Sequence, residues 1–138
     1  TEKATLKFPF FDGQSVSFTL TAQPLETLLK EADFVTLHVP AQEKYVLDKR
    51  EFDMMKKGAG IVNAARGGVL NETALIEALD QEQLSFAALD TFETEPTPQI
   101  KLLMHPKVSL TPHIGAATLE AQDRIGTELA EQIEKLLK

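Results

Sequence analysis

The sequence predicts an α/β fold built on a parallel sheet, with a β-hairpin at its front and a long helix at its end. Apolar runs of strand composition alternate with segments of helical period between residues 34 and 110, as in a parallel sheet whose strands are joined by helices. The dipeptide Asp12-Gly13 separates two β-rich runs, and an apolar stripe of helical spacing follows residue 118. These three observations define the fold class.

The first segment, residues 1–22, is predicted to be a β-hairpin. The runs 5–11 and 15–20 are rich in aromatic and β-branched residues. The Asp-Gly pair between them is favoured where both turn residues adopt positive φ. Pro9 has no N–H donor, which indicates an edge strand.

The second segment, residues 23–117, is predicted to hold the alternating units. Its first helix begins at Pro24 and places Leu25, Leu28, Leu29 and Ala32 on one face. The next strand, 34–39, is apolar on both faces and ends at Pro40. That pattern is expected of a strand covered on both sides.

A second helix is predicted after Asp48, because Asp48 and Glu51 have capping-box spacing and Phe52 shares a face with Met55. Gly58 is expected to close it.

The same alternation continues with a strand at 60–65, a helix at 72–82 opened by Asn71, and a strand at 84–91. The pattern indicates part of a doubly wound, Rossmann-like sheet.

Residues 96–106 contain three prolines and are predicted to form a loop, followed by a short strand at 108–110. A long helix is predicted over the third segment, 118–138. Its stripe needs a partner surface, and it consists of Ile125, Leu129, Ile133 and Leu136.

Composition limits the function classes. The 138 residues suffice for one domain with one core, and a net charge of -7 disfavours binding to nucleic acid or anionic lipid. The absence of cysteine excludes disulfides and thiolate chemistry. With no signal or membrane segment apparent, we expect a cytoplasmic protein without a membrane partner. The chain begins at Thr1, directly before strand-like sequence, so we expect a fragment.

Chemistry collects at the carboxyl ends of parallel strands, and five polar residues are predicted there: His38, Arg66, Asp90, Glu95 and His113. Arg66 precedes two glycines, and its planar guanidinium suits a carboxylate or carbonyl oxygen. The alternative is that Arg66 only pairs with a neighbouring acid.

His113, between Pro112 and Gly115, is suited to take a proton from a hydroxyl near neutral pH. An acid in the loop after residue 91 would orient its imidazole, and local pattern leaves both Glu93 and Glu95 open.

Asp90 ends an apolar run and is expected to be half-buried and to need a donor such as a ligand amide. His38 fits either a ligand wall or a strand end, and His105 is expected at the surface. The sequence has no metal-ligand cluster, no Gly-x-Ser-x-Gly and no Gly-x-Gly-x-x-Gly.

Together these motifs closely resemble the D-isomer-specific 2-hydroxyacid dehydrogenases. The resemblance spans nearly the whole chain. Residues 118–126 and the hairpin sequence Phe-Phe-Asp-Gly-Gln-Ser-Val are most similar to the phosphoglycerate dehydrogenases of that family, including bacterial ones. The motifs are Leu37-His38-Val39-Pro40, Asn-Ala-Ala-Arg-Gly-Gly-Val-Leu-Asn-Glu-Thr-Ala-Leu at 63–75, Asp-Thr-Phe-Glu-Thr-Glu-Pro at 90–96, and Leu-Thr-Pro-His-Ile-Gly at 110–115.

The resemblance implies that Arg66 holds the substrate's carboxylate and carbonyl, that His113 exchanges the hydroxyl proton, and that Glu95 rather than Glu93 pairs with His113. It implies NAD as cofactor, with Asp90 on the nicotinamide carboxamide. The remaining residues implied to line the cofactor are His38, Val39 and Pro40 on the adenosine side, and Ala64, Ala65, Arg66, His113, Gly115 and Ala116.

The implied parent enzyme oxidises 3-phosphoglycerate for serine synthesis, and the fragment is expected to be inactive alone because the family's phosphate-binding loop would precede Thr1. Two alternatives remain, a dehydrogenase for another 2-hydroxy acid such as glyoxylate or lactate, and a non-catalytic binding module. Asn71 and Thr91 depart from the family's usual Asp and Val. In the family the long helix lies near the subunit interface, so we expect homo-oligomers formed through it.

Overall fold

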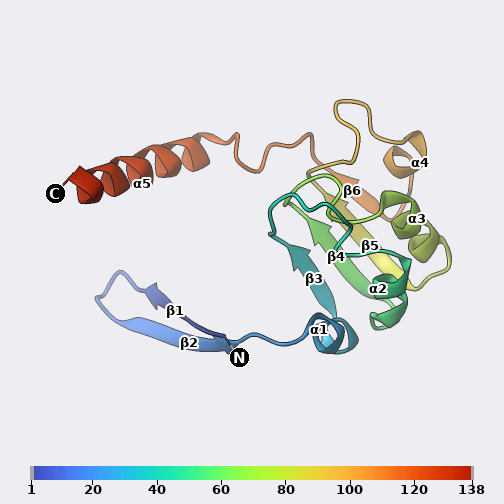
Figure 1. Cartoon of the computed structure of the whole chain (residues 1–138), viewed down its shortest axis with the longest axis horizontal. Coiled ribbons are helices and arrows are strands. Elements are labelled where there is room, and N and C mark those ends of the chain that lie inside the picture. Colours follow the sequence, from blue (N-terminus) through green and yellow to red (C-terminus); the bar gives the residue numbers. More distant parts are fainter. Residues whose placement is uncertain (1, 138) are drawn as a thin grey trace.

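The computed structural model describes residues 2–137, and Figure 1 shows a central sheet from which a hairpin and a long helix extend. This is the α/β architecture that the sequence predicts. The helices are α1 (Leu25–Glu31), α2 (Lys49–Met54), α3 (Glu72–Asp80), α4 (Ile100–Leu103) and α5 (Leu119–Leu137). The strands are β1 (Lys3–Pro9), β2 (Ser15–Thr21), β3 (Phe34–Leu37), β4 (Ala59–Asn63), β5 (Leu84–Leu89) and β6 (Val108–Leu110).

Strands β1 and β2 form an antiparallel hairpin, as predicted. The prediction that Asp12 and Gly13 both have positive φ is wrong. Only Gly13 does, at +83°. The Asp12 carboxylate accepts a hydrogen bond from the Gln14 amide at 3.0 Å, which forms an Asx turn. Phe10 N donates to Gln14 O at 2.8 Å, so the connection is longer than two residues.

The main sheet is parallel in the order β3-β4-β5-β6. Each strand is added on the same side of the preceding one, and crossovers between parallel strands are right-handed. The helices that make these crossovers therefore lie on one face, and α1 to α4 contact one another in sequence order.

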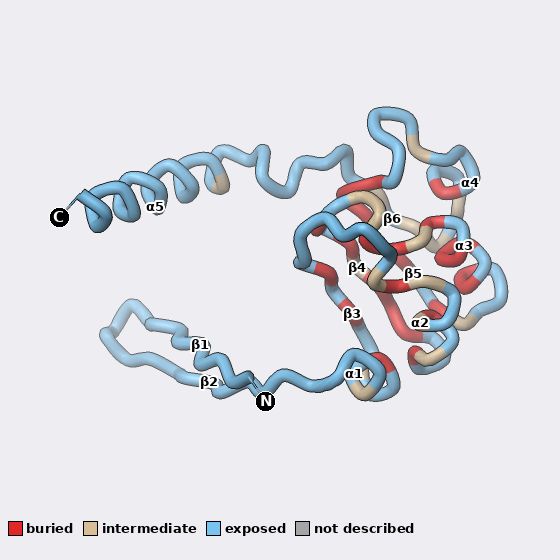
Figure 2. Tube along the Cα trace, in the orientation of Figure 1, coloured by how far each residue is buried: buried red, intermediate tan, exposed pale blue. Residues whose placement is uncertain are grey.

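The core lies between this row of helices and the sheet, and its fully buried residues include Leu29, Phe52, Ile61 and Leu75. Figure 2 shows the buried segments concentrated there. The opposite face is open, and Phe34 on it is 71% exposed. The expectation that residues 34–39 are covered on both faces is therefore wrong within residues 2–137, because no helix crosses back over the sheet.

The element boundaries also differ from prediction. Strands β3 and β5 and helix α3 each end two residues earlier than expected, at Leu37, Leu89 and Asp80, and three further differences have a local cause. Helix α2 ends at Met54, and Met55 is extended, so Gly58 with φ of +83° belongs to the turn before β4. Strand β4 ends at Asn63, because the Asn63 side chain accepts a hydrogen bond from Ala65 N at 3.1 Å. The predicted loop 96–106 contains α4, which is anchored by the fully buried Leu102.

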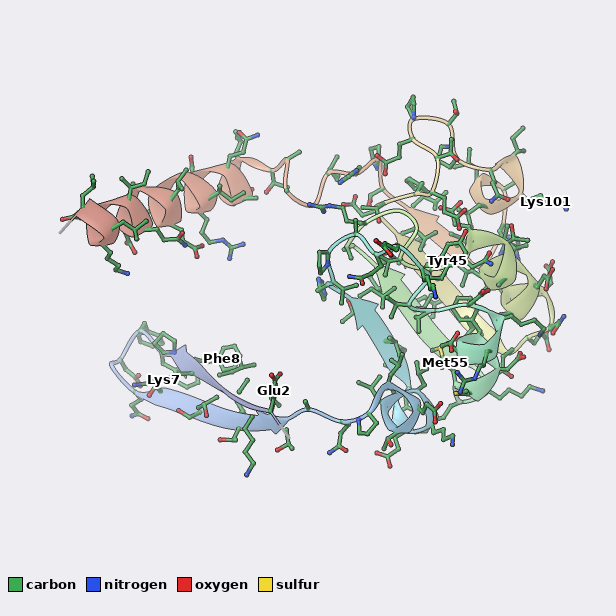
Figure 3. The ribbon with its side chains drawn as sticks, viewed as in Figure 1. Glu2, Lys7, Phe8, Tyr45, Met55 and Lys101 are labelled. Carbon is green, nitrogen blue, oxygen red and sulfur yellow. The ribbon has the colours of Figure 1, made fainter. Side chains whose placement is uncertain are left out.

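The hairpin and α5 contribute nothing to this core. Every residue of β1 and β2 is exposed, and Figure 3 shows Phe8 on the hairpin apart from the sheet. Helix α5 begins after Thr118, whose hydroxyl accepts from Ala121 N at 3.2 Å, and it buries no residue. The boundaries 1–22, 23–117 and 118–138 stay a prediction. Within residues 2–137, no helix combines the length and apolar character needed to span a bilayer.

Candidate active site

The carboxyl ends of the four parallel strands are level with one another. Leu37 is paired with Asn63, Asn63 with Leu89, and Leu89 with Leu110. The residues that follow these positions therefore emerge along one edge of the sheet. This edge is where ligands bind in open parallel α/β sheets.

Asn63 shapes the loop after β4. It is 2% exposed, its Nδ2 donates to Arg66 O at 3.1 Å, and its Oδ1 accepts from Ala65 N. The loop so fixed exposes Arg66, whose Nη1 donates to Ala65 O at 2.7 Å. Among residues 2–137, Arg66 makes no ion pair, so the alternative that it only pairs with a neighbouring acid lacks support.

Gly67 brings this loop against the loop that follows β5. A Cβ on Gly67 would lie 1.8 Å from the carbonyl oxygen of Phe92 and 3.1 Å from Glu93 N. Only a residue without a side chain permits that approach. The loop that carries Arg66 is therefore in direct contact with the loop that carries Glu95.

Glu95 and His113 form a pair at this edge. The Glu95 carboxylate oxygens lie 2.9 and 3.1 Å from His113 Nδ1, and Phe92 N donates to the same carboxylate at 3.0 Å. The hydrogen bond to His113, followed by that from Phe92 N, lowers the pKa of Glu95. With Nδ1 engaged, Nε2 of His113 is the nitrogen left to exchange a proton with a ligand.

The backbone of His113 has φ of +55°, in the left-handed region that few residues other than glycine occupy, although Asn, Asp and His do so more often than the rest. Such conformations occur at functional sites, where surrounding structure holds them. Here the next residues are held by Asp90, which accepts from Ile114 N and Gly115 N at 2.8 Å each.

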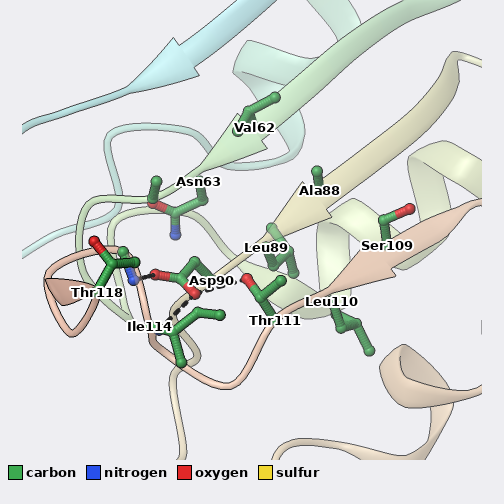
Figure 4. Close-up of a pocket in the computed structure, with 12 residues that line it drawn as sticks. Val62, Asn63, Ala88, Leu89, Asp90, Ser109, Leu110, Thr111, Ile114 and Thr118 are labelled. Carbon is green, nitrogen blue, oxygen red and sulfur yellow. Dashed lines mark hydrogen bonds between the residues drawn. The ribbon is translucent and has the colours of Figure 1, made fainter. Parts of the chain in front are cut away.

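Asp90 is 9% exposed and also accepts from the Thr111 hydroxyl at 2.6 Å. Burial raises the pKa of this carboxyl group, but the three hydrogen bonds outweigh burial and lower it overall. Figure 4 shows Asp90 with Thr111 and Ile114 in a cavity of about 360 Å³. Among residues 2–137, Oδ2 accepts only from Gly115 N, which leaves it a lone pair for one further donor.

This cavity combines apolar walls with one buried acceptor. Its walls include Val62, Ala64 and Ala88, and Asp90 supplies the acceptor. A flat ring against apolar walls with its amide on a carboxylate is consistent with that arrangement. A Cβ on Gly115 would lie 2.8 Å from Asp90 Oδ2, so the glycine keeps this acceptor accessible.

The remaining predicted cofactor-binding residues are His38, Val39, Pro40, Ala65 and Ala116. His38, Val39 and Pro40 follow β3 at the same sheet edge, and His38 Nε2 lies 2.9 Å from the Thr36 hydroxyl. Ala65 is buried under the Arg66 loop. Ala116 is exposed and lines a separate hollow with Arg124.

Glu93, the competing partner for His113, instead accepts from Glu72 N at 2.8 Å. The prediction that His105 lies at the surface is wrong, because its side chain is 8% exposed beside Asp80.

Sequence reasoning missed Asn63, Glu72 and Thr111. A polar residue at the end of a buried strand was the available signal for Asn63, whereas the role of Glu72 depends on a distant loop. Within residues 2–137, no group of three or more acidic or histidine side chains is arranged to hold a metal.

Similarity to known proteins agrees with this geometry. The family model described as "D-isomer specific 2-hydroxyacid dehydrogenase, NAD binding domain" matches residues 12–115. D-3-phosphoglycerate dehydrogenase of Methanocaldococcus jannaschii is 48% identical over 116 residues, which are 83% of this chain and 22% of that protein. Hydroxypyruvate reductase of Thermotoga maritima is 48% identical over 118 residues, 82% of this chain and 39% of that protein.

The holo form of Rhodotorula graminis D-mandelate dehydrogenase has a similar structure, with a TM-score of 0.69 and 38% identity over 72% of this chain and 30% of that one. The chain thus spans only about a fifth to two fifths of the lengths of these relatives. The family's description names NAD, which confirms the predicted cofactor. With three quarters of its residues inside one family model, the chain belongs to the D-isomer-specific 2-hydroxyacid dehydrogenases, as part of their NAD-binding domain.

Proposed function

We propose that this chain is the catalytic part of the cofactor domain of an NAD-dependent dehydrogenase that oxidises D-3-phosphoglycerate to 3-phosphohydroxypyruvate, the entry reaction of serine synthesis. The observation that carries the proposal is the contact of His113 Nδ1 with Glu95 at 2.9 Å. An imidazole held by a carboxylate at a sheet edge is suited to exchange a proton with a hydroxyl.

Each side chain has one role in this proposal. Arg66, which makes no ion pair among residues 2–137, binds the substrate carboxylate and orients the carbon that bears the hydroxyl. His113 Nε2 removes the hydroxyl proton, and Glu95 stabilises the imidazolium that results. NAD, when bound, supplies the acceptor for the hydride.

Asp90, Gly115 and Ala64 would hold the nicotinamide end, with His38, Val39 and Pro40 along the adenosine side. The sequence has no Gly-x-Gly-x-x-Gly loop, and such loops bind the pyrophosphate through backbone amides at a helix N-terminus. We therefore propose that the chain acts within a longer polypeptide and is inactive alone.

A different 2-hydroxy acid is the second candidate. The hydroxypyruvate reductase of Thermotoga maritima is as similar, at 48% identity, as the phosphoglycerate dehydrogenase quoted above. Arg66 recognises the carboxylate that all these substrates share, so its geometry does not select among them. A non-catalytic binding module is disfavoured because Arg66, Glu95 and His113 occur together on adjoining loops.

The experiment is a kcat/KM comparison on the full-length protein that contains this segment, with D-3-phosphoglycerate, D-glycerate and D-lactate at saturating NAD. The proposal predicts that D-3-phosphoglycerate gives the highest kcat/KM, because its phosphate adds binding free energy. A higher value for D-glycerate or D-lactate would reassign the substrate. No turnover of any 2-hydroxy acid would support the binding-module alternative.

A further inference from the structure

Glu72 and Glu93 exchange hydrogen bonds in a way that the proposed reaction does not use. The Glu72 carboxylate accepts from Glu93 N at 2.7 Å, and the Glu93 carboxylate accepts from Glu72 N at 2.8 Å. Glu72 is the first residue of α3, and Glu93 lies in the loop after β5. The pair therefore ties the start of a helix to the loop that leads to Glu95.

The two hydrogen bonds between Glu72 and Glu93 lie close to the Glu95 carboxylate. Glu93 is next to Phe92, whose amide donates to Glu95 Oε1 at 3.0 Å, and the same carboxylate contacts His113. Phe92 is also held from the other side by Gly67. If the Glu93 amide loses its acceptor, the Phe92–Glu93 peptide loses its restraint on the α3 side, and the hydrogen bond from Phe92 N to Glu95 is weakened.

We propose, on the basis of the proposed function, that Glu72 is a positioning residue of the dehydrogenase: its carboxyl group fixes the Glu93 backbone and thereby sets Glu95 against His113. It touches neither substrate nor cofactor. Glu72 affects the reaction through the position of the loop after β5, which carries Glu93 and Glu95.

The burial of Glu72 disfavours the charged form of its carboxyl group. The residue is 2% exposed, and its Oε2 is buried without a hydrogen-bond partner among the described residues. A buried, unpaired carboxylate oxygen is costly, whereas a protonated carboxyl group removes the charge. The titratable groups that interact with it are Glu93 and Glu95 of the loop after β5, and Tyr45 before α2. None of them supplies a positive charge.

The pKa of Glu72 is accordingly raised, first by burial and then by the charges of Glu93 and Glu95, against the lowering effect of the Glu93 amide. A raised pKa in an acid means that the folded state keeps a proton that the unfolded state has released. The stability that this proton contributes is complete below the unfolded pKa of about 4.5 and is lost as the pH rises through the folded pKa.

The test is the pKa of the Glu95 carboxyl group, measured by carbon-13 NMR on this chain. Glu72→Gln keeps the acceptor and the neutral shape. Glu72→Asp is one methylene shorter, so its carboxyl group falls short of the Glu93 amide. Glu77→Asp is the matched control, because Glu77 is exposed on the same helix. Glu72→Ala removes the group.

We expect the Glu95 pKa to remain low in wild type, Glu72→Gln and Glu77→Asp, and to rise toward the ordinary 4.5 in Glu72→Asp and Glu72→Ala. A general loss of stability would not raise it in molecules that remain folded. The proposal is overturned if Glu72→Asp keeps the wild-type value, or if Glu72→Gln either fails to fold or shifts as far as Glu72→Asp. Since the readout needs neither substrate nor NAD, its failure is separate from absence of turnover.

Discussion

Replacing Thr91 with Val should stabilise the folded sheet, although Thr91 lies beside the proposed active-site residue Asp90. Thr91 is 2% exposed, and its hydroxyl is buried with no hydrogen-bond partner among residues 2–137. Leaving a buried hydroxyl unpaired costs about 1–3 kcal/mol on the scale of protein mutational data. Val has nearly the same shape without the hydroxyl, so the expected gain is about 1–2 kcal/mol.

The gain is read from urea unfolding at constant m-value, or as a rise in melting temperature of roughly 3–4 °C per kcal/mol for a chain of this length. Thr73→Val is the matched control, because Thr73 is exposed on α3, and its effect should stay within about 0.5 kcal/mol. If Thr91→Val destabilises the chain while Thr73→Val is neutral, the Thr91 hydroxyl has a partner and the reasoning fails.

Three further predictions concern backbone contact, acid stability and association. Gly67→Ala should destabilise the chain by about 1–3 kcal/mol or more, because its Cβ would meet the Phe92 carbonyl. Gly126→Ala has nothing within 4 Å and should leave the sheet's urea midpoint unchanged. The pKa values of Asp90 and Glu95 are lowered, so the stability they contribute is present above their unfolded pKa values and is lost as the pH falls through the folded ones. Asp90→Asn with Glu95→Gln should flatten that acid decline in urea midpoints, and an unchanged decline would contradict it. Finally, Leu129 and Ile133 on α5 are 55% and 48% exposed. The chain should therefore sediment as an oligomer that Leu129→Ser with Ile133→Ser reduces toward monomer, and a wild-type monomer at high concentration would refute this.

Much of the fold follows from local pattern. The capping box at Asp48 and the cap at Asn71 both form as predicted, because they depend on residues within three positions of each other. The parallel sheet follows from the alternation of strands and helices. The prediction that residues 34–39 are covered on both faces failed because apolar side chains on both faces show only that the strand needs cover on each side. They do not show whether this chain provides a helix for each face.

The candidate site was only partly accessible from sequence. Local pattern left Glu93 and Glu95 equivalent, since both follow β5 in a loop beside Pro96. The structure separates them, because Glu93 binds the start of α3 while Glu95 contacts His113. That choice depends on a contact between two loops at Gly67, and no periodicity reports such a contact.

The claim that His113 is the proton-exchanging residue is tested most directly by kcat/KM of His113→Ala for D-3-phosphoglycerate in the full-length enzyme at saturating NAD. His105→Gln is the control, because His105 pairs with Asp80 away from the sheet edge. General acid–base catalysis by His113 predicts a loss of about 10²–10⁴-fold for His113→Ala and a value near wild type for folded His105→Gln. Retention of kcat/KM within about tenfold by His113→Ala would fall below the range for general acid–base catalysis and would contradict the assignment.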